Sequence, residues 1–116
     1  MNTSNAKKFQ KNLNSGLVGL VLLAVLERFG EDLYGYEIAK RLADANQGNS
    51  PFGGGSIYPV LRQLSADELL VSRIVPSYSG PPRRYYCITP KGREVLAEWK
   101  LIWRNKVSFV DRFTEP

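Results

Sequence analysis

The longest apolar stretch of the chain, Leu17–Leu26, lies near the N-terminus. Its apolar residues fall on nearly all sides of a helix, which is typical of a helix buried in the middle of a domain. It is too short for a bilayer span, which needs about 20 residues, and no cleavage-like pattern of a signal peptide follows it. We therefore expect a core helix from about Asn14 to Phe29, with Ser15 as a candidate cap and Gly30 closing it. The polar and basic residues 1–12 are expected to be frayed or loosely helical.

Two shorter stretches have the spacing of amphipathic helices. The first covers residues 34–45, with Ile38 and Leu42 on one face. The second follows the loop 46–55. A proline in a helix interior costs about 3 kcal/mol, so Pro59 should lie in the first turn, which makes Ser56 the expected N-cap. The expected buried stripe of this helix is Ile57, Val60, Leu61 and Leu64.

Two strand-like segments and a final helix complete the pattern. The segments LLVSRIVP and RRYYCIT flank the turn SYSGPP, which predicts a hairpin with Tyr86 and Ile88 facing the domain and Tyr85 and Cys87 facing outward. Thr89-Pro90 is a helix start, and the helix should run toward Phe113. The expected fold is mostly α with a small β-hairpin: a winged helix-turn-helix followed by a C-terminal helix.

Charge and composition limit the classes of function and partner that the chain can have. The net charge is +5, and residues 1–26 contain Lys7, Lys8 and Lys11 and no acid. This favours an anionic partner such as nucleic acid, although moderate basicity alone is a weak sign. The single cysteine, Cys87, rules out an intramolecular disulfide and fits a cytoplasmic protein. Histidine is absent, which excludes the usual hydrolytic triad. We expect no enzyme activity, cofactor, metal or membrane partner.

On this fold the third helix would be the recognition helix. Ser56, Tyr58, Arg62 and Gln63 are the side chains expected to reach bases or the sugar-phosphate chain. In the hairpin, Gly80 and the following prolines shape the tip, where Arg83 and Arg84 would lie along phosphates or enter the minor groove. The alternatives are an ordinary polar surface helix and a solvated hairpin. The DNA hypothesis requires residues 56–63 and 80–84 to lie on a common side of the molecule.

Three segments, YGYEIAKRL, GSIYPVLRQL and GPPRRYYCITPKG, resemble the signatures of the PadR family of bacterial transcriptional regulators. The resemblance extends from about Leu17 to Gly92. It implies a dimeric winged-helix repressor that binds a roughly palindromic operator on double-stranded DNA. The DNA-contacting positions that it implies here are Tyr36, Ser56, Tyr58, Pro59, Arg62, Gly80, Arg83 and Arg84.

The sequence departs from the family pattern at two places. Glu68 stands where a glycine commonly ends the third helix, so the turn into the hairpin is expected to differ or to be strained. Three glycines and Ser56-Ile57 replace the usual single glycine before the third helix. This segment either brings the backbone close to a phosphate or is a flexible loop without a ligand.

The last helix has a wide apolar face with aromatic anchors, which suits a subunit interface. The resemblance also implies that this helix dimerises the protein. The alternative is a helix folded back on its own core. The expected interface is Val95, Leu96, Trp99, Ile102, Trp103, Lys106, Phe109, Val110 and Phe113.

Trp103 and Trp99 have a second candidate role. In some small PadR members a tryptophan on this helix and its symmetry mate sandwich flat aromatic compounds, and Trp103 occupies the corresponding position. A small planar aromatic effector and plain interface packing both remain open.

The expected organisation is a basic N-terminal arm (1–13), a winged helix-turn-helix domain (14–89) and a dimerisation helix (90–116). The rival hypothesis is a winged-helix module that binds protein or RNA without operator recognition, because fold alone does not determine function.

Overall fold

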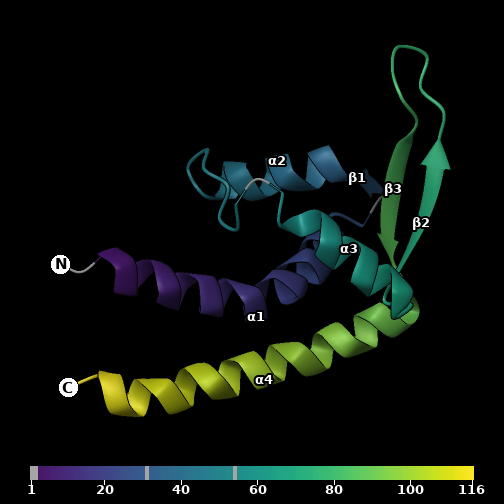
Figure 1. Cartoon of the computed structure of the whole chain (residues 1–116). Coiled ribbons are helices and arrows are strands. Elements are labelled where there is room, and N and C mark those ends of the chain that lie inside the picture. Colours follow the sequence, from purple (N-terminus) through teal and green to yellow (C-terminus); the bar gives the residue numbers. More distant parts are fainter. Residues whose placement is uncertain (1–2, 31, 54) are drawn as a thin grey trace.

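A computed structural model describes residues 3–30, 32–53 and 55–116 of the chain. Four helices and a small antiparallel sheet make up this part of the chain, in the order helix, strand, two helices, two strands, helix (Figure 1). The elements are α1 (Thr3–Phe29), β1 (Leu33–Tyr34), α2 (Gly35–Ala45), α3 (Ile57–Ala66), β2 (Leu70–Val75), β3 (Arg83–Ile88) and α4 (Pro90–Thr114). The predicted fold class is confirmed.

Helix α1 starts well before the predicted start at Asn14. Residues 3–13 continue the helix as one exposed extension, because they contain good helix formers and no glycine or proline. Ser15 is therefore inside the helix, and its predicted role as a cap is wrong. The predicted end is confirmed: Gly30 has φ of 63° and its N–H donates to the Leu26 carbonyl.

The apolar middle of α1 passes through the centre of the domain. Its buried residues are Val18, Leu22, Leu23 and Leu26, and the helix contacts α3, α4 and β3. By length and composition alone α1 could also cross a membrane. Its packing against three other elements explains the apolar composition as that of a core helix, as the sequence predicted.

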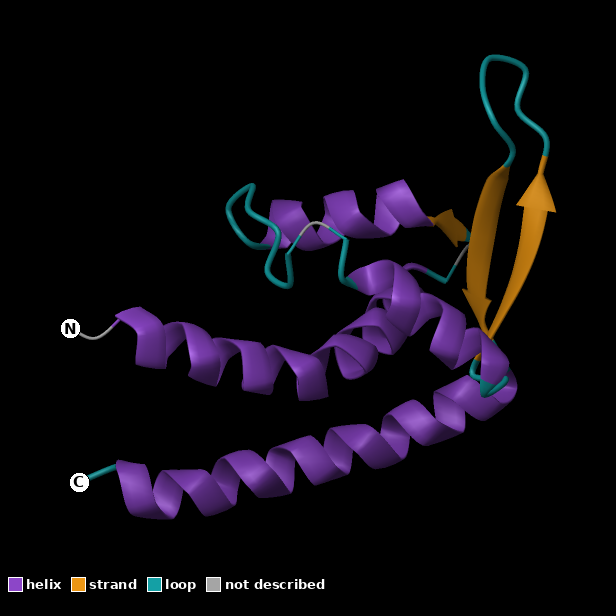
Figure 2. Ribbon diagram, viewed as in Figure 1, coloured by secondary structure: helices purple, strands orange, loops and turns teal. Residues whose placement is uncertain are grey.

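The sheet has one strand more than the hairpin predicted from the sequence. β3 lies between β2 and β1, with antiparallel pairing on both sides. Leu33 pairs with Tyr86 and Tyr34 with Tyr85, so β1 ties the start of α2 to the hairpin. The loop that joins β2 to β3 extends beyond the rest of the molecule (Figure 2). Tyr86 and Ile88 are buried as predicted, whereas Tyr85 and Cys87 are partly covered and not fully outward.

Helix α3 has the predicted register, with Pro59 in the first turn. Ile57, Leu61 and Leu64 are buried, and Val60 is half-buried at the edge of the core. Ser56 precedes the helix, but its backbone is helical and its hydroxyl donates backward to the carbonyls of Phe52 and Gly53. The prediction that Ser56 caps the helix with its side chain is therefore wrong.

The end of α3 confirms the expected strain at Glu68. Glu68 has φ of 64°, in the left-handed region that favours glycine. The Leu69 N–H donates to the Leu64 carbonyl and the Glu68 N–H to the Ser65 carbonyl, which is the Schellman arrangement. The chain thus keeps the helix ending that a glycine normally provides, but with a side chain at the unfavourable position.

Helix α4 begins at the predicted cap. The Thr89 hydroxyl accepts from the Gly92 N–H at 2.9 Å and donates to the Glu68 carbonyl at 2.7 Å, and Pro90 occupies the first turn. Gly92 is packed so tightly that an added Cβ would lie 2.1 Å from the Leu69 carbonyl oxygen. This junction fixes the direction in which α4 leaves the hairpin.

Helices α1 and α4 lie side by side and run in opposite directions, with both chain ends at the same end of the molecule (Figure 1). Glu27 joins them through ion pairs to Lys100 at 3.1 Å and Arg93 at 3.8 Å. The radius of gyration is 16.0 Å, whereas a compact domain of this length has about 13 Å. The excess reflects two long helices whose outer halves extend beyond the core.

Candidate nucleic-acid interface

An open cleft of about 340 Å³ lies between α2, α3 and the sheet. It brings together five of the residues predicted to contact DNA, namely Tyr36, Tyr58, Arg62, Arg83 and Arg84. The expectation that the third helix and the arginines of the hairpin share one side of the molecule is confirmed for these residues. The remaining lining residues are Tyr34, Gly35 and Tyr86.

Gly35 determines how Tyr58 enters this cleft. The tyrosine ring lies so close to the backbone of α2 that a Cβ on Gly35 would be 2.5 Å from Cε1 of Tyr58. Distances below 3.0 Å require a shift of one partner. The glycine therefore allows the first turn of α2 and the first turn of α3 to approach each other, with the tyrosine between them.

Aromatic rings form one wall of the cleft. Tyr34 stacks on Tyr36 with ring centroids 6.3 Å apart and meets Tyr85 edge-on at 5.4 Å. The guanidinium carbon of Arg83 lies 4.5 Å from the centre of the Tyr34 ring. This contact holds an exposed cation beside the cleft without neutralising it.

The second arginine of the hairpin is held by a hydroxyl group. Nη1 of Arg84 donates to Ser72 Oγ at 3.0 Å, and the arginine stays exposed. Neither Arg83 nor Arg84 has an ion pair among the described residues. Arginines that are oriented but not neutralised are suited to phosphate oxygens.

Arg73 is the hairpin arginine that is neutralised. Its Nε donates to Asp32 at 2.6 Å, and its guanidinium carbon lies 5.5 Å from the centre of the Tyr85 ring. The ion pair connects β2 to the segment before β1, so Arg73 holds the base of the hairpin in place.

The other predicted DNA contacts lie outside the cleft. Ser56 and Pro59 are exposed at the start of α3, and Gly80 is exposed in the β2–β3 loop. Gln63 donates to Asp67 at 3.1 Å, which turns it toward the end of α3. The structure therefore does not bring these four residues into the cleft with Tyr58 and Arg62.

Three cleft residues were not predicted. Tyr34 and Tyr86 enter through the pairing of β1 with β3, which joins segments about fifty residues apart. The role of Gly35 could have been predicted from one feature of the sequence, because this glycine lies between two tyrosines in the segment YGYEIAKRL. A small residue flanked by large ones is what a close approach between two elements requires.

The acidic residues near the end of α1 have structural partners. Glu27 pairs with Lys100 and Arg93, Asp32 with Arg73, and Glu37 accepts the Tyr34 N–H at 3.1 Å. Glu31, which belongs to the same run, lies outside the described residues. Among those described, no group of metal-ligating side chains is present.

Burial raises the pKa of the Cys87 thiol, and the Asp32 carboxylate beside it raises that pKa further. A raised pKa keeps the thiol protonated and therefore unreactive at neutral pH.

Helix α4 carries two kinds of surface. At its start Leu96 is fully buried in the core of its own chain, which contradicts its predicted place in a subunit interface. Val95 and Trp99 are partly buried against the same core. The remaining predicted interface residues, Ile102, Trp103, Lys106, Phe109, Val110 and Phe113, are exposed.

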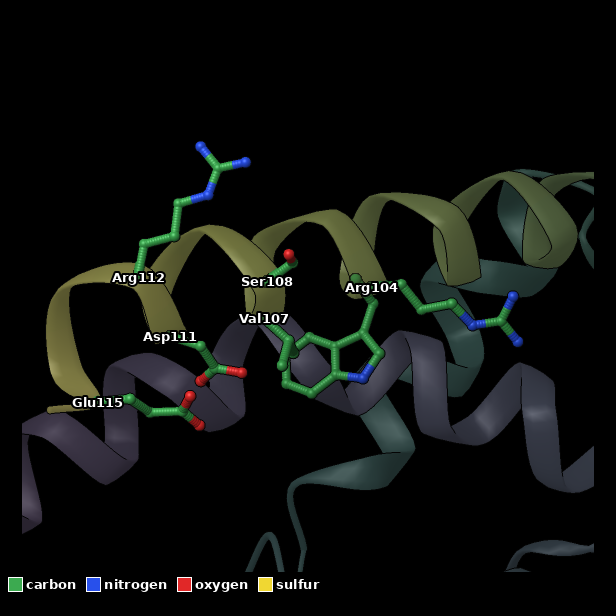
Figure 3. A pocket seen from close by; sticks show the side chains of 7 residues that line it. Arg104, Val107, Ser108, Asp111, Arg112 and Glu115 are labelled. Atoms are coloured by element: carbon green, nitrogen blue, oxygen red, sulfur yellow. The ribbon is translucent and has the colours of Figure 1, made fainter.

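Three hollows adjoin Trp103. One, of about 530 Å³, is lined by α4 alone, and Asp111 and Glu115 extend from one side of the helix and Arg112 from the other (Figure 3). A second, of about 570 Å³, lies between α1 and α4 beside Glu27 and Lys100. A third, of about 280 Å³, lies between the same two helices and is lined by both tryptophans, Trp99 and Trp103. The third hollow is mainly apolar and is the one of the three that both tryptophan rings line, so it is the one that suits a flat aromatic molecule.

The fold and the cleft define a winged-helix, DNA-binding regulator. Residues 22–98 match the family described as "Transcriptional regulator PadR-like family", which is more than half of the chain. The chain therefore belongs to the PadR-like family, which consists of transcriptional regulators and not of enzymes.

Solved structures agree with this assignment. A PadR family transcriptional regulator from Eggerthella lenta is 29% identical, with a TM-score of 0.79 over 97% of this chain and 95% of that chain. A PadR-like transcriptional regulator from Bacillus cereus is 30% identical, with a TM-score of 0.70 over 90% and 98% of the two chains. A transcriptional regulator from Clostridium thermocellum, 22% identical, shares the fold with a TM-score of 0.79 over 90% and 99%. No curated protein sequence matches the chain.

Proposed function

We propose that this regulator is a dimeric repressor that acts in the cytoplasm and binds a roughly palindromic operator. Helix α3 enters the major groove and the β2–β3 hairpin follows the adjacent backbone or minor groove. The observation that carries the proposal is the common cleft of Tyr36, Tyr58, Arg62, Arg83 and Arg84. It combines exposed aromatic side chains, which can contact bases, with arginines that have no acidic partner within the described part of the chain.

Within this proposal the cleft residues have different roles. Tyr58 and Arg62 lie on α3 and read base edges, while Tyr36 supports them from α2. Arg83 and Arg84 contact phosphates. Ser56, Pro59, Gln63 and Gly80 are exposed outside the cleft, and the proposal assigns them to the flanking sugar-phosphate chain.

The proposed dimer pairs the exposed half of α4 with a second copy. Phe109 and Phe113 are 55% and 77% exposed, and their rings meet at 5.4 Å. Exposed apolar side chains in such number on one helix mark an interaction surface. A planar aromatic effector is proposed for the hollow that contains Trp99 and Trp103, where it would act on the dimer and so relieve repression.

Selection of bound sequences from a random duplex pool tests operator recognition directly. We expect an enriched site with two similar half-sites one helical turn apart. Enrichment of a single half-site would contradict an operator that is bound by a dimer. No enrichment, combined with binding to RNA or protein, would favour a winged-helix module of another kind.

Salt titrations on the selected duplex test the role of the hairpin. Arg83→Ala and Arg84→Ala should weaken binding to all duplexes. They should also reduce the slope of the logarithm of affinity against the logarithm of salt concentration by about 0.9 per lost phosphate contact. Arg104→Ala, which removes the same charge from α4, is the control and should bind as the wild type does. Substitutions of Tyr58 or Arg62 should instead change the preferred sequence.

A further inference from the structure

The N-terminal extension of α1, residues 3–13, is held beside the loop that precedes α3. It belongs to one continuous helix whose buried middle passes through the core, and it extends beyond that core (Figure 1). The Asn14 amide, which directly follows the extension, donates to the Pro51 carbonyl in the loop at 3.4 Å. Phe52, the next loop residue, packs against the core. Because both partners of this hydrogen bond are anchored, the extension has a fixed direction relative to α3.

The exposed face of α3 lies between the hairpin on one flank and this extension on the other. At about 100° per residue, the exposed Pro59 lies opposite the buried Ile57. Tyr58 turns toward the cleft that it shares with the hairpin arginines. Val60 is offset from Tyr58 by about 200°, and together with Ser56 it lines a hollow of about 590 Å³ between α3 and the extension. A duplex that meets the exposed face therefore has a basic element on each flank.

Two lysines of the extension line this hollow. Lys7 and Lys11 are one turn apart on the same side of α1, and both are exposed. None of the described residues that line the hollow is acidic, and neither lysine has an ion pair in the described part of the chain. Lys8 is exposed as well but does not line the hollow. Lys7 and Lys11 therefore place two charges without acidic partners beside the start of α3.

We propose that Lys7 and Lys11 bind DNA phosphates on the flank of α3 that is opposite to the hairpin. The assignment rests on the proposed function, to which it adds a second site of contact with the DNA backbone. The major groove is about 12 Å wide and is bordered by a phosphate chain on each side. Arg83 and Arg84 bind phosphates on one flank of α3, and the two lysines bind those on the other. Contacts on both flanks fix the orientation of α3 in the groove.

Salt titrations on the selected duplex test the lysines one at a time. Lys7→Ala and Lys11→Ala should each reduce the slope of log affinity against log salt concentration by about 0.9, and weaken binding about fivefold at about 0.15 M salt. The preferred sequence should not change, because phosphate contacts carry no sequence information directly. Lys8→Ala is the matched control, since it removes the same charge from the same extension outside the hollow. It should change the affinity by less than about twofold. Lys11→Arg keeps the charge and should keep the affinity and the slope.

Hydroxyl-radical cleavage of the bound duplex locates the contacts. Replacing both lysines by alanine should restore cleavage of sugars on one side of each half-site. Arg83→Ala should restore it on the other side, because the hairpin and the extension flank α3 from opposite directions. Restored cleavage of the same sugars in both proteins would overturn the placement of the lysines.

Unchanged affinity and slope in both lysine variants would overturn the proposal, and a normal effect of Arg83→Ala in the same experiment would leave the proposed function intact. A change in the sedimentation of the lysine variants without DNA would also overturn it, and would assign the lysines to contacts between subunits. A wild type that binds no duplex would overturn the proposed function together with this site. Circular dichroism verifies that each variant is folded.

Discussion

At the scale of single residues, the close contact between Gly35 and Tyr58 controls the shape of the cleft. Gly35→Ala should displace the tyrosine ring, because the new Cβ would lie 2.5 Å from Cε1. We expect duplex affinity to fall by about tenfold while the free energy of unfolding changes by less than about 1 kcal/mol. Binding and denaturant titrations on the same preparation measure the two effects.

Gly16→Ala is the control for this substitution. Apart from its chain neighbours and the backbone of its own helix, no described atom lies within 4 Å of a Cβ at Gly16, which is in the exposed part of α1. It should leave DNA binding unchanged and stabilise the protein by about 0.5–1 kcal/mol, as expected for alanine in a helix. Normal DNA binding by Gly35→Ala would show that the position of Tyr58 is unimportant for recognition.

Glu68 is the residue whose backbone conformation suits glycine best. Because its φ is 64°, Glu68→Gly should raise the free energy of unfolding by about 0.5–1 kcal/mol. Asp67→Gly, at the preceding residue with φ of −82°, should instead lower it by a similar amount. Urea denaturation distinguishes the two, and a destabilised Glu68→Gly would mean that the glutamate side chain compensates for the strain.

At the scale of elements, the hydrogen bonds of Thr89 join α4 to the end of α3. Thr89→Ala removes the bond from the Gly92 N–H and the bond to the Glu68 carbonyl. We expect a loss of about 1–2 kcal/mol in the free energy of unfolding, as for other N-caps. Thr114→Ala, which removes an exposed hydroxyl from the last turn of α4, should change it by less than about 0.5 kcal/mol.

The elements with a regular hydrophobic pattern were predictable from the sequence. The buried stripe of α3, the hairpin strands and the Thr89 cap all follow from local rules of spacing and capping. The two-residue strand β1 was not predictable, because it exists only through its pairing with β3. The early start of α1 was missed because polar residues without periodicity give no sign of a helix that extends from a buried core.

The candidate site was predictable to the extent that single elements define it. Tyr58 and Arg62 were found from the face of α3 that opposes its buried stripe, and Arg83 and Arg84 from their position at the hairpin. Ser56 and Gln63 were placed with them, but their side chains bond to Phe52 and to Asp67. Such local competition between side-chain partners depends on atomic positions that spacing alone does not give.

At the scale of the whole molecule, the burial along α4 determines which part can form a dimer. Leu96 is fully buried in the core of its own chain, whereas Trp103 is 41% exposed and Phe113 77%. The first turns of α4 therefore complete the domain, and the later turns remain for a partner. The alternative of a helix folded back on its own core is thus correct for the first turns of α4, and the subunit interface stays a prediction for the later turns.

Trp103→Lys tests the dimer at the boundary between these two segments. A charge at the centre of an apolar interface must be desolvated without a partner, so sedimentation should show monomers where the wild type is dimeric. Because Leu96 and the Glu27 ion pairs are untouched, the monomer should keep its helical circular dichroism spectrum. Glu98→Lys, on an exposed side of the same helix, should remain dimeric. A wild type that sediments as a monomer would contradict the interface, and with it the expectation of an operator with two halves.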